Sequence, residues 1–512
     1  MTFKSLLLTD LYQLTMVRAY LSSGKAKSKA VFEVFFRHCP FDGEYAVVAG
    51  HNLVKEILEE FYFSEDDLHY LKEQPTFNDA PPEFFEALQN LDFKDIHVRG
   101  LAEGSLVFPR VPLLELSGPL YKLQLLESVL LNALNFASLC ATYARRLYQV
   151  ANHKTLVEFG LRRAQGPNGA MIASRSSYIG GCDGTSNVLA GKEFQIPIVG
   201  TIAHSFVQSF WAVQEEDLQW KERNIIELLE QVKKEDGLQT NEGELGAFLA
   251  YAKTFPSNLL LLVDTYDSLQ SGVPNAIRVF KILRQLGFLP IGIRLDSGDL
   301  VYLSKTARQQ LDQAGFPEAQ IFASNELGEK VIESLEDQGA KIDGYGVGTN
   351  LVTCRSDPAL GGVYKLVELD GHPRMKLSEQ TEKLVIPCSK NVYRLYGEDG
   401  KMLVDLLTEI NEKPPQAGKE IQIFHPYDFF KETKVIPSTV EPLFQTLFSN
   451  GEWQQERGLE EIRKRSLQQM KNLREDIRRQ HYPTPYKVSL TKNLRQRLTE
   501  LYQFESPSRL LR

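Results

Sequence analysis

The stretch Ile196-Pro-Ile-Val-Gly-Thr-Ile-Ala-His204 is a short apolar run that ends in a hydroxyl group and an imidazole. Runs of this length, bounded by polar residues, are typical of buried strands. The same construction recurs along the middle of the chain, at 155–163, 259–267, 289–299, 320–326 and 342–350. Strands that carry polar residues at their carboxyl ends are how an α/β barrel builds an active site.

Helix-like stretches separate the apolar runs. Leu300 to Ala314 and Leu327 to Asp337 both have apolar residues at helical spacing. Repeated strand–helix units predict parallel strands, and a closed or nearly closed barrel is the natural arrangement of six or more of them. The sequence therefore predicts an α/β barrel for the middle of the chain.

Strand-like runs also occur on both sides of the barrel, at Ala30–Phe36, Val363–Leu369 and Asn391–Tyr396. Asp-Gly pairs come after the last two runs and are typical of hairpin turns. These runs predict a second, mixed α+β domain built from N- and C-terminal segments. The predicted organisation is an N-terminal α/β segment of the second domain at 1–105, the catalytic barrel at 106–353, a strand-containing segment completing the second domain at 354–445, and a charged helical extension at 446–512.

Composition limits the classes of function. The chain has 512 residues, 43% of them hydrophobic, and a formal net charge of -8, which argues against a protein that coats nucleic acid or an anionic membrane. Five scattered cysteines without a C-x-x-C pair argue against a disulfide framework or a structural zinc site. We find no apolar stretch long enough to span a bilayer and no signal-peptide pattern, so we expect a cytoplasmic protein.

His204 is the first candidate for chemistry. It comes after Gly200-Thr201 at the end of a predicted strand. There an imidazole can act as a base or as a nucleophile toward phosphorus. A structural histidine at the edge of the core is the alternative, and the residues alone leave both open.

Arg294-Leu-Asp296-Ser-Gly-Asp299 places a cation and two carboxylates at one strand end. The carboxylates could hold Mg²⁺ or the hydroxyls of a ribose, and the arginine could clamp a carboxylate or phosphate. An internal salt bridge between Arg294 and Asp296 is the alternative. Asp264 and Asp267 add two acids to the same barrel mouth, which favours a metal or a basic ligand-binding lining.

Two further patterns suggest anion binding. In Gly346-Val-Gly-Thr-Asn350, glycines allow close approach of backbone N–H groups to a phosphate, although a plain glycine turn would look the same. The pairs Arg145-Arg146 and Arg162-Arg163 lie in apolar surroundings, so we expect them to be buried against an anion, either a phosphorylated substrate or an acid such as Glu158. The residues alone thus support a phosphate-handling barrel enzyme without revealing its substrate.

The motifs together resemble nicotinate phosphoribosyltransferases. They occur in the order typical of that family and extend through about Leu369, with a looser resemblance beyond it. The matching stretches are Leu7–Met16, Phe159–Gly166, Gly180–Gly191, Gly200–Ser205, Arg294–Asp299 and Gly346–Asn350.

The resemblance implies an irregular α/β barrel of the type II phosphoribosyltransferase kind beside a mixed α+β domain. It implies that nicotinate and 5-phosphoribosyl 1-pyrophosphate give nicotinate mononucleotide and pyrophosphate, in the salvage (Preiss–Handler) route to NAD. It also implies a ligase-type coupling to ATP hydrolysis, Mg²⁺ with the pyrophosphoryl substrates, and a homodimer with its sites at the subunit interface.

The resemblance also assigns roles to residues. His204 matches the histidine that takes the γ-phosphoryl group of ATP. Nicotinate would contact Tyr12, which reaches the site from the neighbouring subunit, together with Thr201 and Arg294, and Arg162 is a second candidate for its carboxylate.

The phosphoribosyl pyrophosphate would lie elsewhere in the same site. Thr349, with Gly346 and Gly348, matches the cradle for the 5′-phosphate. Asp296 is a candidate for the ribose hydroxyls or Mg²⁺, and Asp299 is a second candidate for the metal.

The sequence leaves three rival interpretations open. One is a neighbouring phosphoribosyltransferase that uses nicotinamide, which needs no carboxylate clamp, or quinolinate, which needs more cations. Another is an unrelated metal-dependent barrel enzyme, such as an aldolase or hydrolase, which ATP would not affect. The last is a catalytically silent barrel kept for binding.

Overall fold

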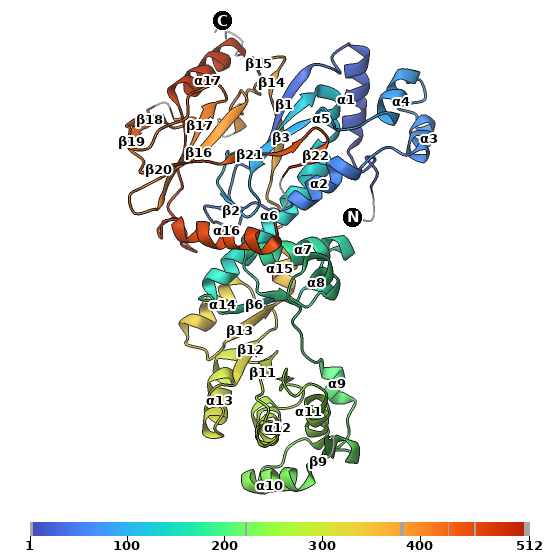
Figure 1. Cartoon of the computed structure of the whole chain (residues 1–512), viewed down its shortest axis with the longest axis vertical. Helices are drawn as coiled ribbons and strands as arrows, with labels where there is room; N and C mark the ends of the chain where they lie inside the picture. The colour runs from blue at the N-terminus through green and yellow to red at the C-terminus, as the bar shows by residue number, and fades with distance from the viewer. Residues whose placement is uncertain (1–3, 221–222, 379–382, 429, 455–456, 506–512) are drawn as a thin grey trace, which may run out of the picture. The chain divides into compact units, whose positions relative to one another are not determined.

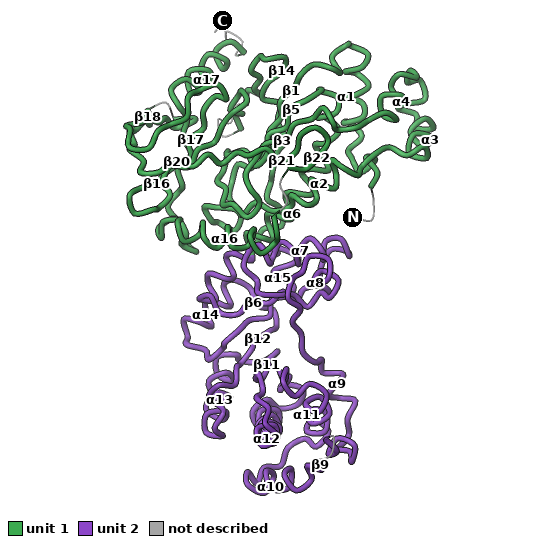
Figure 2. The backbone as a smooth tube through the Cα atoms, in the orientation of Figure 1, with its two compact units in different colours: residues 1–143, 356–512 green, residues 144–355 purple. Residues whose placement is uncertain are grey.

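The computed structural model describes residues 4–220, 223–378, 383–428, 430–454 and 457–505. The chain divides into two compact units (Figure 2). Unit 1 comprises Met1–Tyr143 and Ser356–Arg512, and unit 2 comprises Ala144–Arg355. N- and C-terminal segments therefore form one unit together, as the sequence predicts.

The boundaries of the units differ from those expected from the sequence. Residues 106–143, predicted to open the barrel, belong to unit 1 because β5 (Leu114–Pro119) pairs with β1 (Lys29–Phe35). The predicted helical extension at 446–512 also contributes a strand, β23 (Val488–Leu490), which pairs in parallel with β17 (Met402–Glu409). Both differences come from pairing between residues distant in sequence.

Unit 2 is built on a six-stranded sheet in the order β10-β11-β12-β13-β6-β7 (Figure 1). Every neighbouring pair in it is parallel. The strands are β6 (Thr155–Glu158), β7 (Gly184–Thr185), β10 (Leu260–Leu262), β11 (Gly292–Leu295), β12 (Gln320–Ala323) and β13 (Gly344–Val347). All residues of β10 and β13 are buried, as expected for strands covered on both faces.

Helices connect these strands, so the predicted strand–helix alternation is confirmed. The helices of unit 2 are α7 (Gly166–Gly180), α8 (Val188–Phe194), α9 (His204–Gln208), α10 (Ile226–Asp236), α11 (Glu242–Thr254), α12 (Val273–Gln285), α13 (Leu300–Gln313), α14 (Glu329–Asp337) and α15 (Thr349–Thr353). Short elements complete it: η1 (Leu161–Arg163), η2 (Glu215–Leu218), β8 (Gln219–Trp220), β9 (Arg223–Asn224) and a π-helical turn, η3 (Ser268–Gly272).

The apolar run before His204 does not form the regular buried strand that the sequence predicts. The run makes a parallel bridge between Ile198 and Thr185, and the side chain of Ile198 is 60% exposed. Pro197 has no N–H to donate to a ladder, which explains the short pairing. The run still continues the sheet beyond β7, because Val199 N donates to the Thr185 carbonyl at 3.0 Å.

The same segment also approaches the opposite edge of the sheet. Thr201 Oγ1 donates to the carbonyl of Leu260 in β10 at 2.8 Å. The segment 198–201 therefore bridges the two edge strands, β7 and β10, and the sheet curves into an irregular barrel.

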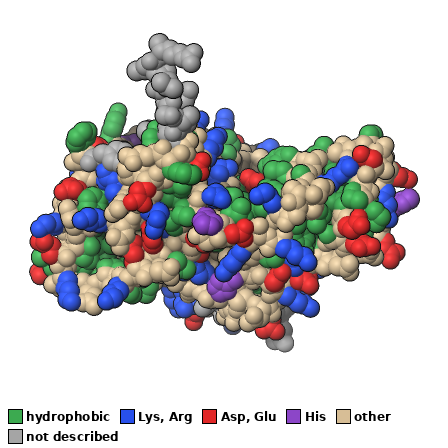
Figure 3. Space-filling model, turned by 90° about the horizontal axis from the view of Figure 1, so that it is seen from above, with side chains coloured by type: hydrophobic (Ala, Val, Ile, Leu, Met, Phe, Trp, Pro, Cys, Tyr) green, Lys and Arg blue, Asp and Glu red, His purple; other side chains and the backbone are tan. Residues whose placement is uncertain are grey.

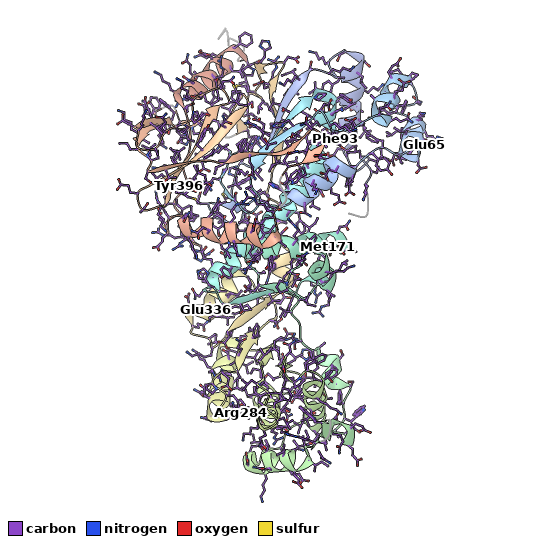
Figure 4. All side chains as sticks on the ribbon, in the orientation of Figure 1. Glu65, Phe93, Met171, Arg284, Glu336 and Tyr396 are labelled. Carbon is purple, nitrogen blue, oxygen red and sulfur yellow. The ribbon has the colours of Figure 1, made fainter. Side chains whose placement is uncertain are left out.

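Polar contacts at the amino ends of the strands are structural. Glu336 (labelled in Figure 4) accepts from Tyr345 Oη at 2.5 Å and from Lys154 Nζ at 2.6 Å. Tyr345 lies in β13 and Lys154 directly precedes β6, so this carboxylate joins α14 to two neighbouring strands. In barrels of this kind the amino ends of the strands serve stability and the carboxyl ends carry the chemistry.

Unit 1 contains two larger sheets. The seven-stranded sheet has the order β15-β14-β1-β5-β3-β21-β22, and the six-stranded sheet has the order β19-β18-β23-β17-β16-β20. β14 (Val363–Leu369) pairs antiparallel with β1, which confirms that C-terminal strands complete a domain begun at the N-terminus. The remaining strands are β2 (Ala46–Val47), β3 (His97–Leu101), β4 (Leu106–Val107), β15 (His372–Pro373), β16 (Lys390–Tyr396), β18 (Ile421–Phe424), β19 (Glu432–Val435), β20 (Thr439–Pro442), β21 (Phe444–Ser449) and β22 (Glu452–Trp453).

The helices of unit 1 have local start signals. Ser64 and Asp67 form a reciprocal capping box at the start of α3, and Pro82 occupies the first turn of α4, where its missing N–H costs nothing. The helices are α1 (Leu11–Ser22), α2 (His51–Glu60), α3 (Glu65–Glu73), α4 (Pro82–Gln89), α5 (Leu120–Leu125), α16 (Leu459–Asn472) and α17 (Lys492–Glu505), with α6 (Glu127–Val150) continuing into unit 2. In the described part of the chain, no helix is long and apolar enough to cross a membrane.

Candidate active site

His204 lies at the first turn of α9, directly after the segment that bridges the barrel edges. Its side chain is 43% exposed, so the ring is accessible. Nδ1 lies 3.2 Å from Thr265 Oγ1, and Nε2 lies 3.9 Å from Asp296 Oδ2. The structure thus places the histidine between residues that come after β10 and β11.

Two carboxylates meet at this end of the barrel. Asp264 Oδ2 accepts from the backbone N–H of Asp296 at 3.2 Å and from Ser297 Oγ at 2.5 Å. Asp296 Oδ1 in turn accepts from Ser324 Oγ at 2.5 Å. These bonds join the ends of β10, β11 and β12, and they hold Asp296 facing the imidazole.

Arg294 lies in β11, in register with Leu262 of β10 and Phe322 of β12. Its Nη2 donates to the Ile202 carbonyl at 3.3 Å, and its buried Nε has no hydrogen-bond partner among the described residues. Burial lowers the pKa of Arg294, while the charges of Asp296 and Asp264 oppose this effect. The guanidinium therefore retains donor capacity for an anionic ligand.

The alternative of a simple Arg294–Asp296 salt bridge is not what the structure contains. In the described residues, the Asp296 carboxylate lies 3.9 Å from the imidazole and accepts from Ser324, and the arginine donates to a carbonyl. The Asp296 carboxylate and the Arg294 guanidinium are thus available separately to ligands.

Asp299 and Asp267 have a different role from Asp296. Asp299 Oδ1 accepts from the backbone N–H groups of Val301 and Tyr302, so it caps α13. Asp267 caps the turn η3 in the same way. Of the four acids predicted at the barrel mouth, two therefore serve as helix caps.

The donors at this end of the barrel fit one kind of metal ion. Within the described residues, no group of three or more His, Cys, Asp and Glu side chains is arranged to hold an ion. One carboxylate oxygen, Asp264 Oδ1, is buried without a hydrogen-bond partner in the same part of the chain. Mg²⁺ usually takes only one or two carboxylates and completes its shell with water and substrate phosphates, so Asp264 and Asp296 fit such an ion.

The glycine segment lies at the end of β13. Gly346 is buried inside the strand, where an added Cβ would lie 2.4 Å from the ring of Phe159, so this glycine serves close packing. Gly348 and Thr349 come directly after the strand and begin α15. The first amides of a helix have no partner inside it, so Gly348 and Thr349 match the predicted phosphate cradle better than Gly346.

The expectation of buried arginine pairs was wrong for one pair. Arg162 and Arg163 are exposed in η1, whereas Arg145 and Arg146 are buried. Arg146 is paired with Glu329 rather than with a ligand. The charge of Arg162 lowers the pKa of Arg294, so the two cations act on the same part of unit 2.

The remaining nicotinate candidates are placed differently. Thr201 lies in the barrel, but its hydroxyl already donates to the Leu260 carbonyl. Tyr12 lies on α1 of unit 1 with its side chain 49% exposed, so it is not part of the cluster that unit 2 builds.

Two residues of unit 2 with notable surroundings were not predicted from the sequence. Thr265 contacts His204 directly. Glu244, in α11, is fully buried and accepts from Ser271 Oγ and Asn275 Nδ2. Burial, together with the charges of Asp264 and Asp267, raises the pKa of Glu244 to about 7. Thr265 stands between two aspartates that were predicted, but nothing in the sequence near Glu244 marks its burial.

A cluster of cations in unit 1 was also not predicted. Burial lowers the pKa of Lys365 in β14; Glu127 opposes the shift, and Arg37 and Lys376 add to it. Arg37 Nε is buried without a hydrogen-bond partner among the residues described. The one signal in the sequence was a lysine inside the strand-like run at 363–369.

Known proteins match this chain along nearly its whole length. Residues 7–135 match the N-terminal domain of nicotinate phosphoribosyltransferase, residues 154–401 match the nicotinate phosphoribosyltransferase family, and residues 389–498 match the C-terminal domain. The chain is 45% identical over 523 residues to nicotinate phosphoribosyltransferase of Dictyostelium discoideum, covering 98% of this chain and 88% of the relative. The chain belongs to the nicotinate phosphoribosyltransferase family.

Other members of the family agree with this assignment. The human nicotinate phosphoribosyltransferase sequence is 40% identical, covering 98% of this chain and 97% of its own. The crystal structure of human nicotinic acid phosphoribosyltransferase superposes with a TM-score of 0.86 at 38% identity, covering 96% of this chain and 99% of that chain. A nicotinate-nucleotide pyrophosphorylase from Pyrococcus furiosus, at 23% identity and a TM-score of 0.63, covering 91% of this chain and 94% of its own, shares the fold. The expected fold class, an irregular barrel with a second mixed domain, is confirmed.

Proposed function

We propose that this member of the family transfers the phosphoribosyl group of 5-phosphoribosyl 1-pyrophosphate to nicotinate, giving nicotinate mononucleotide and pyrophosphate for NAD synthesis. The observation that carries the proposal is the cluster of His204, Asp296 and Arg294 at one end of the barrel. It combines a nucleophile, an acid and an incompletely bonded guanidinium, which suits phosphoryl chemistry and a carboxylate substrate.

His204 is the proposed acceptor of the γ-phosphoryl group of ATP, which makes the enzyme ATP-coupled and ligase-type. The Asp296 carboxylate faces Nε2 and favours a proton on that nitrogen. Nδ1 is then the nitrogen with a free electron pair, beside the Thr265 hydroxyl. Nδ1 attacks phosphorus, the bond from the γ-phosphorus to the bridging oxygen breaks, and ADP leaves. Hydrolysis of the N–P bond by water then releases phosphate and restores the imidazole.

Nicotinate is the proposed partner of Arg294. A guanidinium binds a carboxylate through two parallel N–H donors, and the buried Nε of Arg294 has no partner among the described residues. Arg162, exposed and nearby, is a second cation for the same carboxylate or for pyrophosphate. Nicotinamide has no carboxylate to use this clamp, so the site favours nicotinate.

Pyrophosphate must leave with its negative charge stabilised. When bound, Mg²⁺ would supply that charge stabilisation, with Asp264 and Asp296 as the carboxylates that fit it. Gly348 and Thr349 would hold the 5′-phosphate through backbone N–H groups. The role of Asp299 as a helix cap makes it a weaker metal candidate than Asp264.

The active protein is proposed to be a cytoplasmic homodimer. Tyr12 would then supply an aromatic face for the pyridine ring of nicotinate from the neighbouring subunit. Its exposed side chain on α1 is compatible with contact to another chain.

The test is formation of nicotinate mononucleotide with Mg²⁺, with and without ATP, comparing the intact protein with His204→Ala and Asp296→Asn. We expect ATP to raise the rate only in the intact protein. Asp296→Asn should slow phosphorylation on the order of 10²-fold or more, because the imidazole loses the negative charge that favours a proton on Nε2. Phosphohistidine is detected by its acid lability after incubation with γ-labelled ATP.

Other outcomes lead to different conclusions. Turnover of nicotinamide or quinolinate but not nicotinate would keep the barrel chemistry and change the substrate. An ATP effect that survives in His204→Ala would remove the phosphohistidine from the mechanism. Absence of turnover with all three pyridines would contradict the proposed function itself.

A further inference from the structure

A cavity of about 450 Å³ lies within unit 1, distant in sequence from the residues of the barrel site. It is lined by a cationic part and an apolar part. Arg110, Lys431 and Lys487 supply positive charge, and Pro109, Pro426 and Tyr486 supply flat apolar surface. A cavity of this size is within the range of small-molecule sites.

The backbone at Arg110 has a conformation that is unusual for a residue with a side chain. Val111 N donates to the Phe108 carbonyl at 3.2 Å, which closes a turn with Pro109 and Arg110 at its centre. Arg110 has a φ of 74°, the left-handed region in which such turns favour glycine. A residue with a long side chain at this position carries a cost in backbone strain.

The guanidinium of Arg110 is held but incompletely bonded. Its Cζ lies 5.0 Å from the centre of the Tyr427 ring. Its Nε is buried without a hydrogen-bond partner in the described part of the chain. The arginine is thus oriented by an aromatic ring and retains a donor for an anion.

His425 adds a neutral donor to the same wall. Its Nδ1 accepts from the backbone N–H groups of Tyr427 at 3.2 Å and Asp428 at 2.9 Å. The proton of the neutral ring is therefore on Nε2. Burial lowers the pKa of His425, the charges of Arg110 and Lys431 lower it further, and the charge of Asp428 opposes them. The net shift is downward, so the ring stays neutral near pH 7.

Lys431 Nζ pairs with Asp428 Oδ2 at 3.1 Å, whereas Arg110 and Lys487 form no salt bridge among the described residues. Glu44 is half-buried, and burial raises the pKa of its carboxyl. Glu432 already accepts from Gln422 Nε2 at 3.2 Å. A ligand with hydroxyl or amino groups could use these carboxylates, while its anionic group takes the cationic part.

We propose that this cavity is a nucleotide-binding site. The phosphate would bind Arg110, Lys431 and Lys487, and the planar base would lie against the prolines and the ring of Tyr486. Tyr486 is buried and stacks on Phe108 with ring centres 3.5 Å apart, so it is a rigid wall for a base. None of these residues belongs to the site proposed for catalysis in unit 2.

The test is photolabelling of the full-length protein with 2-azido-ADP, then mapping of the labelled peptides by mass spectrometry. We expect label on peptides from 421–433 and 484–490. The proposed catalytic site binds adenine nucleotides too, so its label on unit 2 peptides serves as an internal reference.

Two variants test the cationic part. The double variant Lys431→Gln/Lys487→Gln should reduce unit 1 labelling more than tenfold, because it removes two of the cations proposed to bind the phosphate. Both residues are exposed, so their replacement should leave the fold intact. Lys434→Gln is the matched control and should label normally. Lys434 lies in β19, three residues after Lys431, but it does not line the cavity. Arg110→Gly suits the turn and should also lose label while keeping its melting temperature within a few degrees.

The results separate this proposal from the proposed function. Label confined to unit 2, or unit 1 labelling unchanged in the double variant, would overturn the nucleotide site whatever the enzyme's activity. Normal synthesis of nicotinate mononucleotide by the double variant, together with loss of unit 1 label, would establish a second site. Displacement of the unit 1 label by AMP but not by inorganic phosphate would support recognition of the base, and equal displacement by phosphate alone would overturn it.

Discussion

Arg294 shows how one residue combines burial with unused bonding capacity. It lies on a strand inside the barrel sheet, yet its Nε has no partner among the described residues. A buried donor without a partner is costly, so the cost is offset when a ligand supplies an acceptor. This unused donor is the basis of the anion site that we propose at Arg294.

We expect Arg294→Gln to raise the KM for nicotinate roughly 10- to 150-fold, because a charge-assisted hydrogen bond contributes about 1.5–3 kcal/mol. Arg294→Lys should recover only part of this, since an ammonium cannot form the two-pronged bond. Steady-state kinetics at varied nicotinate concentrations measures the KM of each variant. Arg284→Gln, at the end of α12 with its guanidinium over Phe316, is the control and should leave the KM unchanged (Figure 4). An equal rise in both variants would point to a general loss of structure.

Glu244 gives a pH dependence of stability. Its pKa is raised from 4.5 to about 7 in the folded chain. The folded protein therefore binds this proton more tightly than the unfolded chain does. The group's contribution to stability is fully present below pH 4.5 and is lost as the pH rises through 7.

We expect Glu244→Gln, which cannot titrate, to gain stability relative to the intact protein by about 1–4 °C in melting temperature between pH 5 and pH 8. Thermal melts across this range measure the difference. Glu242→Gln, an exposed position in the same helix, is the matched control. A difference between Glu244→Gln and the intact protein that does not change with pH would show that Glu244 is ionised in the fold.

At the scale of elements, the site depends on the residues that come directly after each strand. Asp296 and Asp299 are three residues apart in one predicted motif, yet one faces the histidine and the other caps α13. The reason is position, because the residue just before a helix is placed to accept its first N–H groups. The sequence motif identified both acids. The start of α13 makes Asp299 a helix cap and leaves Asp296 facing the histidine.

The packing of β13 against Phe159, directly after β6, yields a prediction of its own. An added Cβ at Gly346 would lie 2.4 Å from the Phe159 ring, so Gly346→Ala should lower the free energy of unfolding by about 1–3 kcal/mol. Gly169→Ala, inside α7 with only a 3.9 Å contact, should instead raise it by roughly 1 kcal/mol through helix propensity. Denaturant titration measures both. An unchanged free energy of unfolding in Gly346→Ala would mean that this glycine is not needed for packing.

At the scale of the whole molecule, charge does not favour non-specific partners. The net charge is -8, and on the face displayed in Figure 3 the basic and acidic side chains are interspersed without a broad basic patch among the described residues. The anion binding that we propose is instead confined to local groups at the barrel end of unit 2 and in the cavity of unit 1.

The proposed homodimer is testable by complementation. If Tyr12 serves the neighbouring subunit, a mixed dimer of Tyr12→Ala and His204→Ala chains has one site with both defects and one with neither. Co-expression should then restore about a quarter of the normal activity, since half of randomly assembled dimers are mixed and each has one intact site. Activity is measured on the co-purified pair. No restoration, despite mixed dimers on native mass spectrometry, would place Tyr12 in its own subunit's site or outside the site.

The sequence by itself determined the parallel strands, the helices between them and the end of the sheet at which polar residues gather. These depend on local pattern, because hydrophobic period and turn residues act over a few positions. Even there, Pro197 shortened one expected strand to a bridge.

Only the tertiary structure decided which groups are free to react. It buried Arg145 and Arg146, exposed Arg162 and Arg163, assigned two acids to helix caps, and gave residues 106–143 to the other unit. The burial and the change of unit depend on partners distant in the chain, such as Glu329 for Arg146 or β1 for β5. Burial and pairing are properties of those partners, and the local sequence does not contain them.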